Sequence, residues 1–333
     1  MFDRLVAVAP SDAYAWAMLA DYANLKGRTE DARTALNRAV ELAPATAPIR
    51  MRRLNFCVEM RDSVCALKDG KVILKLTDAY DGVIFMYYTA LGVRVEDTLE
   101  SGLPESGRAM RRFATQLAKS ANSPSEAMLA WDRLRTLGQA DEATACGIAQ
   151  HLVLRGEPAG AWRVWKEFLS DRNIKEGSLN LLTNSEFKRN PTTSPFDWSI
   201  RPQPGVSFQR QNGLQIRFAG ETNLAFLNVI QMSYVQPLQH RLLLDVSYEG
   251  ITTNRGPFLR LVDAENPARL NLKSEMFQGS SPRRRIELNF TVPAGTRLVR
   301  LQLERTPSEK FDNKIAGTLH LHRIALFEAA RQL

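Results

Sequence analysis

Residues 13–46 read AYAWAMLADYANLKGRTEDARTALNRAVELAPAT, and this stretch decides the fold of the first half of the chain. Apolar and small residues recur in it at spacings of three and four, which is the period of a helix with one buried face. Gly27 divides the stretch into two helical segments, and Pro44 ends the second, since both residue types interrupt helices. We therefore expect a hairpin of two helices. Its inner faces carry Trp16, Leu19, Ala20, Ala32, Leu36 and Ala39.

The same pattern recurs with a period of 34 residues elsewhere in the first half. Pro10 stands 34 residues before Pro44, so the chain begins inside a repeat and we expect further sequence upstream. The apolar residues of segment 47–122 have the spacing of helices, but the positions of the 34-residue repeat cannot be assigned within this segment. A second match pairs Pro124, Ala127, Trp131 and Leu134 with Pro158, Ala161, Trp165 and Phe168.

These residues resemble the pattern of the tetratricopeptide-repeat family. The match is clear over residues 13–46 and degenerate over about 108–175. The resemblance implies an α-solenoid of helical hairpins over residues 1–175, whose groove docks a protein partner. The alternative is that a short array serves only as a support for the second domain.

From about Leu179 onwards the apolar residues alternate with a period of two. Short alternating segments separated by turn residues predict an antiparallel β-sandwich, here over residues 179–330. The polar segment Asp171–Ser178 is the expected linker. The expected strands include Leu181–Phe187, Leu214–Phe218, Leu242–Tyr248, Ile286–Phe290, Leu298–Leu303 and Leu319–Ile324.

The order of motifs in residues 179–330 resembles the galactose-binding-like jelly roll of many carbohydrate-binding modules. The motifs are the opening Leu181–Phe187, then Val229–Pro237, Phe290–Gly295 and the closing Gly317–Leu321. The resemblance implies a jelly-roll sandwich that binds a polysaccharide.

Many modules of this type hold a structural calcium ion through an acidic residue after the opening Phe and an Asp in the last strand. This chain has Lys188 at the first place, and His322 and Arg323 in the last strand. Cations there would repel calcium, which needs several oxygen ligands. Although Glu186 and Asp312 offer oxygen atoms, we expect no bound metal and no cofactor.

Sugar recognition needs an aromatic face beside polar groups. Each aromatic residue in this half could instead lie in the core of the sandwich. We expect this for Tyr248, because it alternates along its strand in the same phase as Leu242 and Leu244. The candidate platforms are Trp198, Tyr234, Phe258 and Phe277.

The net charge of +8 lies almost wholly on the second half. Residues 1–177 hold 24 basic and 23 acidic side chains, and the rest of the chain holds 20 basic and 13 acidic ones. A basic face can bind an anionic polymer, and an acidic polysaccharide suits the domain type. Nucleic acid is not expected, because no stacking motif accompanies the arginines. A solvated basic face is the alternative. The candidate arginines are Arg255, Arg260, Arg283, Arg284 and Arg285, and Arg297 and Arg300 could join them in one patch.

The cysteines and histidines indicate no metal centre. Cys57, Cys65 and Cys146 are odd in number and have no CxxC spacing, so we expect buried free thiols rather than a disulfide framework or a zinc site. His320 and His322 alternate with leucines and so point to one face of a strand. Two imidazoles at that spacing can bind a metal, but we expect a solvated strand face.

The sequence contains no nucleophile elbow, P-loop, dinucleotide-binding, zincin or EF-hand motif, so we expect a protein that is not an enzyme. The order of its two domains resembles accessory proteins of bacterial exopolysaccharide and cell-envelope assembly. This implies a scaffold that docks a protein partner through the repeats and binds polysaccharide through the sandwich.

Two other functions remain open, and so does the location. One is a polysaccharide-modifying enzyme with its site in the sandwich or at the domain junction, and the other is an adaptor that binds no sugar. The resemblance implies the periplasm or cell envelope. Because no export signal precedes the first repeat, the cytoplasm is the alternative. No apolar run is long enough to span a membrane.

Overall fold

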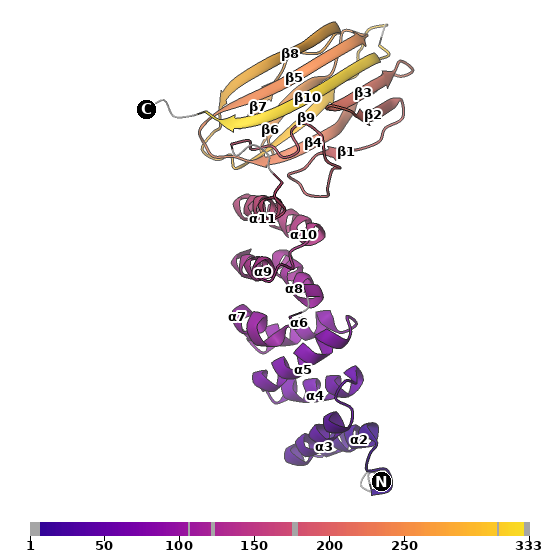
Figure 1. Cartoon of the computed structure of the whole chain (residues 1–333), viewed down its shortest axis with the longest axis vertical. Coiled ribbons are helices and arrows are strands. Elements are labelled where there is room, and N and C mark those ends of the chain that lie inside the picture. The colour runs from indigo at the N-terminus through magenta and orange to yellow at the C-terminus, as the bar shows by residue number, and fades with distance from the viewer. Residues whose placement is uncertain (1–6, 106, 121–123, 175–178, 312, 330–333) are drawn as a thin grey trace. The chain divides into compact units, whose positions relative to one another are not determined.

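The computed structural model describes residues 7–105, 107–120, 124–174, 179–311 and 313–329 (Figure 1). The chain forms two compact units, Met1–Ala140 and Asp141–Leu333. The first unit is helical, and the second holds two helices followed by two antiparallel sheets. The predicted order of a helical array and a β-sandwich is confirmed. No described helix is both long enough and apolar enough to cross a membrane.

The predicted repeat at 13–46 is a helical hairpin made by α2 (Ala13–Leu25) and α3 (Thr29–Leu42). α2 begins after Asp12, whose Oδ1 accepts hydrogen bonds from the backbone of the first helical turn. This contact satisfies N–H groups that the start of a helix leaves unpaired. Gly27, at φ 73°, turns the chain between the helices. The small buried residues that let the helices approach closely are Ala17, Ala20, Ala32 and Ala39.

The segment 47–122, through which no repeat phase could be followed, is also helical. After α6 the backbone passes through a three-residue helix and a π-helical turn instead of a full second helix, which shifts the repeat spacing. Tyr88 of α6 packs against this turn and donates a hydrogen bond to the carbonyl of Gly102 at 3.1 Å. The further elements of this unit are α4 (Ala47–Glu59), α5 (Ser63–Leu76), α6 (Asp81–Ala90), α7 (Val95–Asp97), η1 (Thr98–Gly102), α8 (Gly107–Lys119) and α9 (Pro124–Thr136).

A buried carboxylate ties α4 to α5. Asp69 on α5 is 0% exposed, and its oxygens accept hydrogen bonds from Arg50 Nη1 and Arg53 Nη2 of α4, each at 2.6 Å. Burial, together with the Asp69 carboxylate, raises the pKa of the Tyr88 hydroxyl well above its ordinary value. Because a buried charge is stable only when it is paired, the two guanidinium groups are needed to hold Asp69 in the interior.

We predict that Asp69→Asn lowers the free energy of unfolding of the helical unit by about 3 kcal/mol, because it leaves two guanidinium groups without their buried partner. Chemical denaturation followed by the helical circular dichroism signal measures the change. Asp21→Asn is the matched control, since Asp21 pairs with Arg52 on the surface, and it should cost less than about 1 kcal/mol. Equal costs for the two variants would contradict the importance of the buried pair.

Cys57 and Cys65 form a disulfide, so the expectation of free thiols was wrong for this pair. Cys57 lies near the end of α4 and Cys65 at the start of α5, and the hairpin brings their Cα atoms to 5.7 Å, a separation that disulfides span. The sequence did not reveal the pair because the turn between the two helices could not be placed. The sulfur atoms lie near Asp69. A disulfide offers no thiolate and Asp69 is already held by two arginines, so this group does not fit a metal ion.

We predict that the protein, when it is produced in an oxidising compartment and unfolded without a reductant, has one thiol that an alkylating reagent can label. Cys146 is free and buried, and the other two cysteines are joined. Mass spectrometry after alkylation in denaturant should show one label before reduction and three labels after it, matching the three cysteines of the chain. Three labels before reduction would refute the disulfide.

The last helical hairpin belongs to the second unit. It consists of α10 (Glu142–Leu154) and α11 (Pro158–Asp171). Trp162 of α11 meets Phe196 edge to face, with ring centroids 5.0 Å apart, and Trp165 Nε1 donates a hydrogen bond to Thr183 Oγ1 at 3.4 Å. Residues 175–178 of the expected linker lie outside the described residues, and the compact units divide between Ala140 and Asp141.

Two five-stranded antiparallel sheets form the sandwich (Figure 1). The β4–β9 sheet has the strand order β1-β4-β9-β6-β7, and the β5–β10 sheet has the order β2-β3-β10-β5-β8. Several strands that follow one another in the chain lie in opposite sheets, as expected for a jelly roll. The strands are β1 (Ser199–Ile200), β2 (Val206–Arg210), β3 (Leu214–Ala219), β4 (Phe226–Tyr234), β5 (Gln239–Ile251), β6 (Phe258–Asp263), β7 (Asn271–Lys273), β8 (Gly279–Thr291), β9 (Leu298–Arg305) and β10 (Ala316–Glu328).

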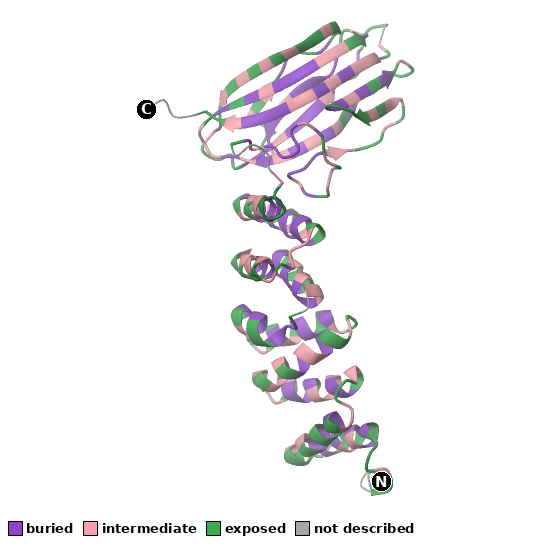
Figure 2. Cartoon of the chain, in the orientation of Figure 1, coloured by how far each residue is buried: buried purple, intermediate pink, exposed green. Residues whose placement is uncertain are grey.

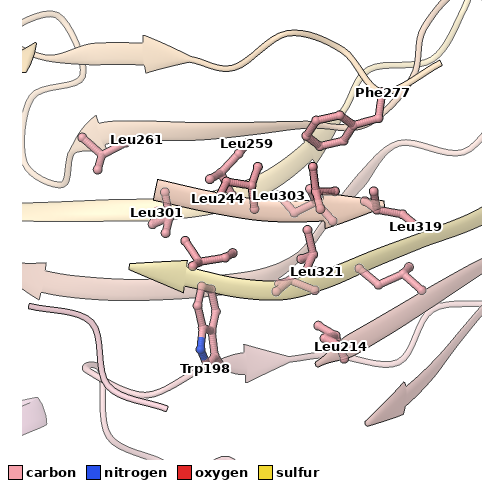
Figure 3. Close-up of a cluster of buried hydrophobic side chains, with 14 of the residues drawn as sticks. Trp198, Leu214, Leu244, Leu259, Leu261, Phe277, Leu301, Leu303, Leu319 and Leu321 are labelled. Carbon is pink, nitrogen blue, oxygen red and sulfur yellow. The ribbon is translucent and has the colours of Figure 1, made fainter. Parts of the chain in front are cut away.

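Alternating apolar side chains fill the space between the sheets. Figure 2 shows buried residues alternating with more exposed ones along the central strands. On β10, Leu319 and Leu321 are buried, whereas His320 between them is partly exposed on the outer face. Leucines from both sheets meet Trp198 and Phe277 in one cluster (Figure 3). The core thereby fixes which side chains the outer faces present.

Residues 181–187 do not form the predicted opening strand. Asn184 and Phe187 have φ values of 51° and 57°, and such left-handed values interrupt an extended backbone. The segment instead lies against β10, where the carbonyl of Ser185 accepts a hydrogen bond from Ile324 N at 2.9 Å.

Candidate functional site

Three of the four candidate aromatic platforms are buried. Trp198 and Phe277 are 1% and 0% exposed and belong to the core cluster, as the core alternative requires (Figure 3). Phe258 is 7% exposed and alternates with the core residues Leu259 and Leu261, so it lies on the other face of β6. Lys273 Nζ lies 5.5 Å from the centroid of its ring, which therefore offers little surface to a sugar. Tyr234 is half-buried at the end of β4, and its hydroxyl accepts a hydrogen bond from the side chain of Gln236.

Two of the candidate arginines share one carboxylate on the outer face of the β5–β10 sheet. Arg285 Nε donates a hydrogen bond to Asp245 Oδ1 at 2.8 Å, and Arg283 Nη2 lies 3.7 Å from Asp245 Oδ2. The hydrogen bond from Arg285 and the nearby positive charges hold the pKa of the Asp245 carboxyl below its ordinary value. Part of the positive charge expected at this corner is thus neutralised.

Carboxylates also accompany two of the remaining candidate arginines. Arg284 Nη2 lies 2.5 Å from Glu275 Oε1, and Arg260 Nη1 lies 3.0 Å from Glu304 Oε2. Arg255 is exposed. The arginines chosen from the sequence therefore do not form one continuous cationic face.

Polar side chains from three neighbouring strands meet on the outer face of the β5–β10 sheet. Gln215 of β3 is the register partner of His320 of β10, which in turn is the partner of Ser247 of β5. In the adjoining row, Thr318 of β10 is the partner of Glu249 of β5. Because residues two apart along a strand share a face, these five polar groups stand on one surface.

These side chains line a cavity of about 520 Å³, which we call the sheet cavity. Tyr248 and the segment Ser280–Pro282 at the start of β8 complete its walls. Small-molecule sites in proteins occupy about 300–1,000 Å³, so the size suits a ligand. The lining presents hydroxyl, amide, imidazole and carboxylate groups, while the ring of Tyr248 packs against Phe277 of the core with centroids 5.5 Å apart.

The sequence did not single out Gln215, Ser247, Glu249 or Thr318. Period two already placed each of them on the polar face of a strand, as with Gln215 between Leu214 and Ile216. Only the pairing of β3, β10 and β5 shows that the polar faces adjoin. That pairing joins segments far apart in the sequence, and no local pattern encodes it.

His320 and His322 stand side by side on the sheet face, as predicted, with ring centroids 3.9 Å apart. His322 Nε2 is hydrogen-bonded to Ser247 Oγ at 2.8 Å. Burial lowers the pKa of both imidazoles below the ordinary value of 6.5, and the Arg283 guanidinium contributes in the same direction. The two rings are therefore neutral at pH 7. Among the described residues, no third His, Cys, Asp or Glu completes a group of metal ligands with them.

We predict that the histidine pair makes stability fall with acidification. A pKa lowered on folding means that the unfolded chain takes up protons more readily, so the stabilisation is complete above pH 6.5 and declines as the pH falls below it. The melting temperature of the wild type should fall more steeply between about pH 7 and pH 5 than that of the His320→Gln, His322→Gln double variant. An unchanged slope in the double variant would contradict this origin of the pH dependence.

The residues at the expected calcium position do not fit the ion. Lys188 Nζ lies 2.5 Å from Glu186 Oε2, and this contact lowers the pKa of the Glu186 carboxyl. The positive charges of Arg323 and Arg283 act on the same carboxyl. Calcium needs several oxygen ligands, and three neighbouring cations oppose it. Asp312, the other oxygen donor considered, lies outside the described residues.

No protein-family model and no curated protein matches the chain. Among solved structures, the second half is similar to the carbohydrate-binding module TmCBM61 in complex with β-1,4-galactotriose (TM-score 0.33, 12% identity, covering 46% of this chain and 100% of that one). It is also similar to a CBM4 module (TM-score 0.34, 10% identity, covering 44% and 99%). The tetratricopeptide-repeat protein YrrB, described as having an unusual peptide-binding site, has TM-score 0.27 and 14% identity, covering 52% and 93%. At identities and TM-scores this low, the likenesses assign no function.

Proposed function

We propose that this chain is a non-catalytic scaffold whose β-sandwich binds polysaccharide in the sheet cavity and whose helical array docks a protein partner. We place it in exopolysaccharide or cell-envelope assembly, in the periplasm. The sheet cavity is the observation that carries the proposal.

The chemistry of the sheet cavity suits a sugar. Each sugar hydroxyl both donates and accepts hydrogen bonds, and the cavity offers both kinds of partner. Gln215 supplies an amide, Ser247 and Thr318 supply hydroxyls, and Glu249 supplies an acceptor. Tyr248 also lines the cavity, but its ring packs against the core, with its centroid 5.5 Å from that of Phe277. Such a mixture of hydrogen-bond donors and acceptors favours a neutral or weakly charged polyol over an apolar ligand.

The same cavity offers little support for catalysis. Glycoside hydrolysis commonly uses a pair of carboxylic residues on either side of the scissile bond. Of the described residues that line the cavity, Glu249 is the one carboxylate. Its neighbours are hydroxyls and an amide, which favours binding over hydrolysis.

An exposed apolar stripe on α2 supports protein docking by the helical array. The stripe has spacings of four, four and three residues, so its members lie along one side of the helix. Exposed apolar patches on soluble proteins commonly mark interaction sites. The stripe consists of Tyr14, Met18, Tyr22 and Leu25, with exposures from 36% to 81%.

The disulfide between Cys57 and Cys65 supports a location outside the cytoplasm. Disulfides persist in oxidising compartments such as the bacterial periplasm and are rare in the cytosol. This favours the periplasm over the cytoplasmic alternative.

We predict that affinity gel electrophoresis of the full chain shows retardation by at least one polysaccharide in a panel of neutral and acidic polymers. The Gln215→Ala, Ser247→Ala double variant should weaken that interaction about thirtyfold, because it removes two hydrogen-bonding groups worth about 1 kcal/mol each. Asn289→Ala is the matched control, since Asn289 lies exposed on β8 of the same sheet but outside the cavity.

Two outcomes would overturn the proposal in different ways. The absence of retardation in every polymer would favour the adaptor that binds no sugar. The release of shortened or modified polymer during incubation, detected by chromatography, would favour the enzyme.

A further inference from the structure

A second cavity, of about 510 Å³, lies within the second unit between α10 and the β4–β9 sheet. We call it the helix–sheet cavity. Val153 of α10 contributes to one wall, and Ile230 and Met232 on the outer face of β4 contribute to the opposite one. It involves a different sheet from the sheet cavity and shares none of its lining residues.

Two arginines at the helix–sheet cavity have no carboxylate partner. Arg201 and Arg300 both line it, and neither forms an ion pair with any residue in the part of the chain that the structure describes. Arg300 donates a hydrogen bond from Nε to the neutral Gln302 Oε1 at 2.9 Å. This contrasts with the arginines near the sheet cavity, such as Arg285, which have carboxylate partners. The helix–sheet cavity thus carries two arginines without a carboxylate partner.

The backbone beneath these arginines is fixed. Arg201 N donates to the carbonyl of Asn228 at 2.9 Å, and Asn228 Nδ2 donates to the carbonyl of Arg201 at 3.1 Å. Arg300 is the register partner of Met232. Arg201 and Arg300 thus stand two strands and four residues apart, which places their Cα atoms roughly 16 Å from each other by ordinary strand spacings. The two cations face opposite ends of one site, which suits a ligand with more than one negative group.

Polar side chains in the region between the arginines can hydrogen-bond a ligand. Ser199 of β1 is the register partner of Ile230, so it shares the outer face of the sheet, and it lines the cavity. Gln150 of α10 is exposed and also lines the cavity. A hydroxyl and an amide both donate and accept hydrogen bonds, as sugar hydroxyls require.

We propose that the helix–sheet cavity binds an acidic oligosaccharide, a run of uronic acid units. Arg201 and Arg300 bind carboxylates on different sugars, Ser199 and Gln150 exchange hydrogen bonds with ring hydroxyls, and the apolar wall at Met232 contacts the C–H face of a ring. A uronate supplies all three features in one unit. This inference rests on the proposed function for its class of polymer, and it adds a second site with a charge preference.

Isothermal titration of the full chain with matched acidic and neutral trisaccharides tests the inference. The probes are tri-galacturonate with galactotriose, and tri-mannuronate with mannotriose, so that each pair differs in its carboxylates. We expect at least one uronate to bind about tenfold more tightly than its neutral counterpart, with an affinity that falls as salt is added. Arg201→Gln and Arg300→Gln should each weaken uronate binding about tenfold and leave binding of the neutral trisaccharides unchanged.

Controls separate this site from general charge and from the sheet cavity. Arg297→Gln removes an exposed arginine that contacts only backbone carbonyls and lies outside the cavity, and it should bind uronate like the wild type. Arg201→Lys keeps the charge and should recover part of the affinity. Gln215→Ala, Ser247→Ala should leave the uronate preference intact. Loss of uronate binding in this last variant would assign the acidic sugar to the sheet cavity and overturn the inference.

The inference also fails if neither uronate binds, or if both arginine variants bind uronate like the wild type. Binding of a neutral trisaccharide in those cases would leave the proposed function standing. The absence of binding by any polysaccharide or trisaccharide would remove both.

Discussion

The register of β10 between β3 and β5 is the constraint on which the sandwich and its proposed site depend. Leu319 and Leu321 of β10 enter the core only in this register, and His320 then lies between Gln215 and Ser247 on the outer face. A slip of one residue would exchange the two faces, exposing leucines and burying the imidazoles. The hydrophobic core therefore determines the site, because the side chains excluded from it form the polar rows of the sheet cavity.

Electrostatic pairing explains why a dense run of basic residues in the sequence is a poor guide to which positive charges lack a carboxylate partner in the fold. The triplet Arg283 to Arg285 is the densest basic run in the sequence, yet Asp245 and Glu275 accompany it in the fold. Arg201 and Arg300 are isolated in the sequence but have no carboxylate partner among the described residues. Attraction for an anion depends on charge left without a partner, and partners are set by strand neighbours rather than by sequence proximity.

Much of the fold could be predicted because its signals are local. The helical hairpin at 13–46 and the strands β3, β5, β8, β9 and β10 follow directly from apolar periods of 3.6 and two. The opening segment 181–187 has apolar residues typical of a strand, but left-handed backbone at Asn184 and Phe187 interrupts it. Strands β1 and β7 are two and three residues long, too short to give a period.

The site was harder to predict because it depends on contacts between distant segments. Trp198 and Phe277 are the residue types that bind sugars, but the same apolar surface makes them good core residues, and the structure buries them. The disulfide was missed for a similar reason, since Cys57 and Cys65 meet only through the turn between α4 and α5. Residue type indicated which side chains of the second half are candidates for binding a sugar. Strand pairing decided which of these side chains lie on the surface.

The central claim is that the outer face of the β5–β10 sheet binds carbohydrate. A crystal structure of the full chain with an oligosaccharide from a polymer that it binds tests this claim most directly. The account predicts a sugar in the sheet cavity, within hydrogen-bonding distance of Gln215 and Ser247. An oligosaccharide bound only to the helical hairpins, or a sheet cavity left empty at saturating ligand, would contradict it.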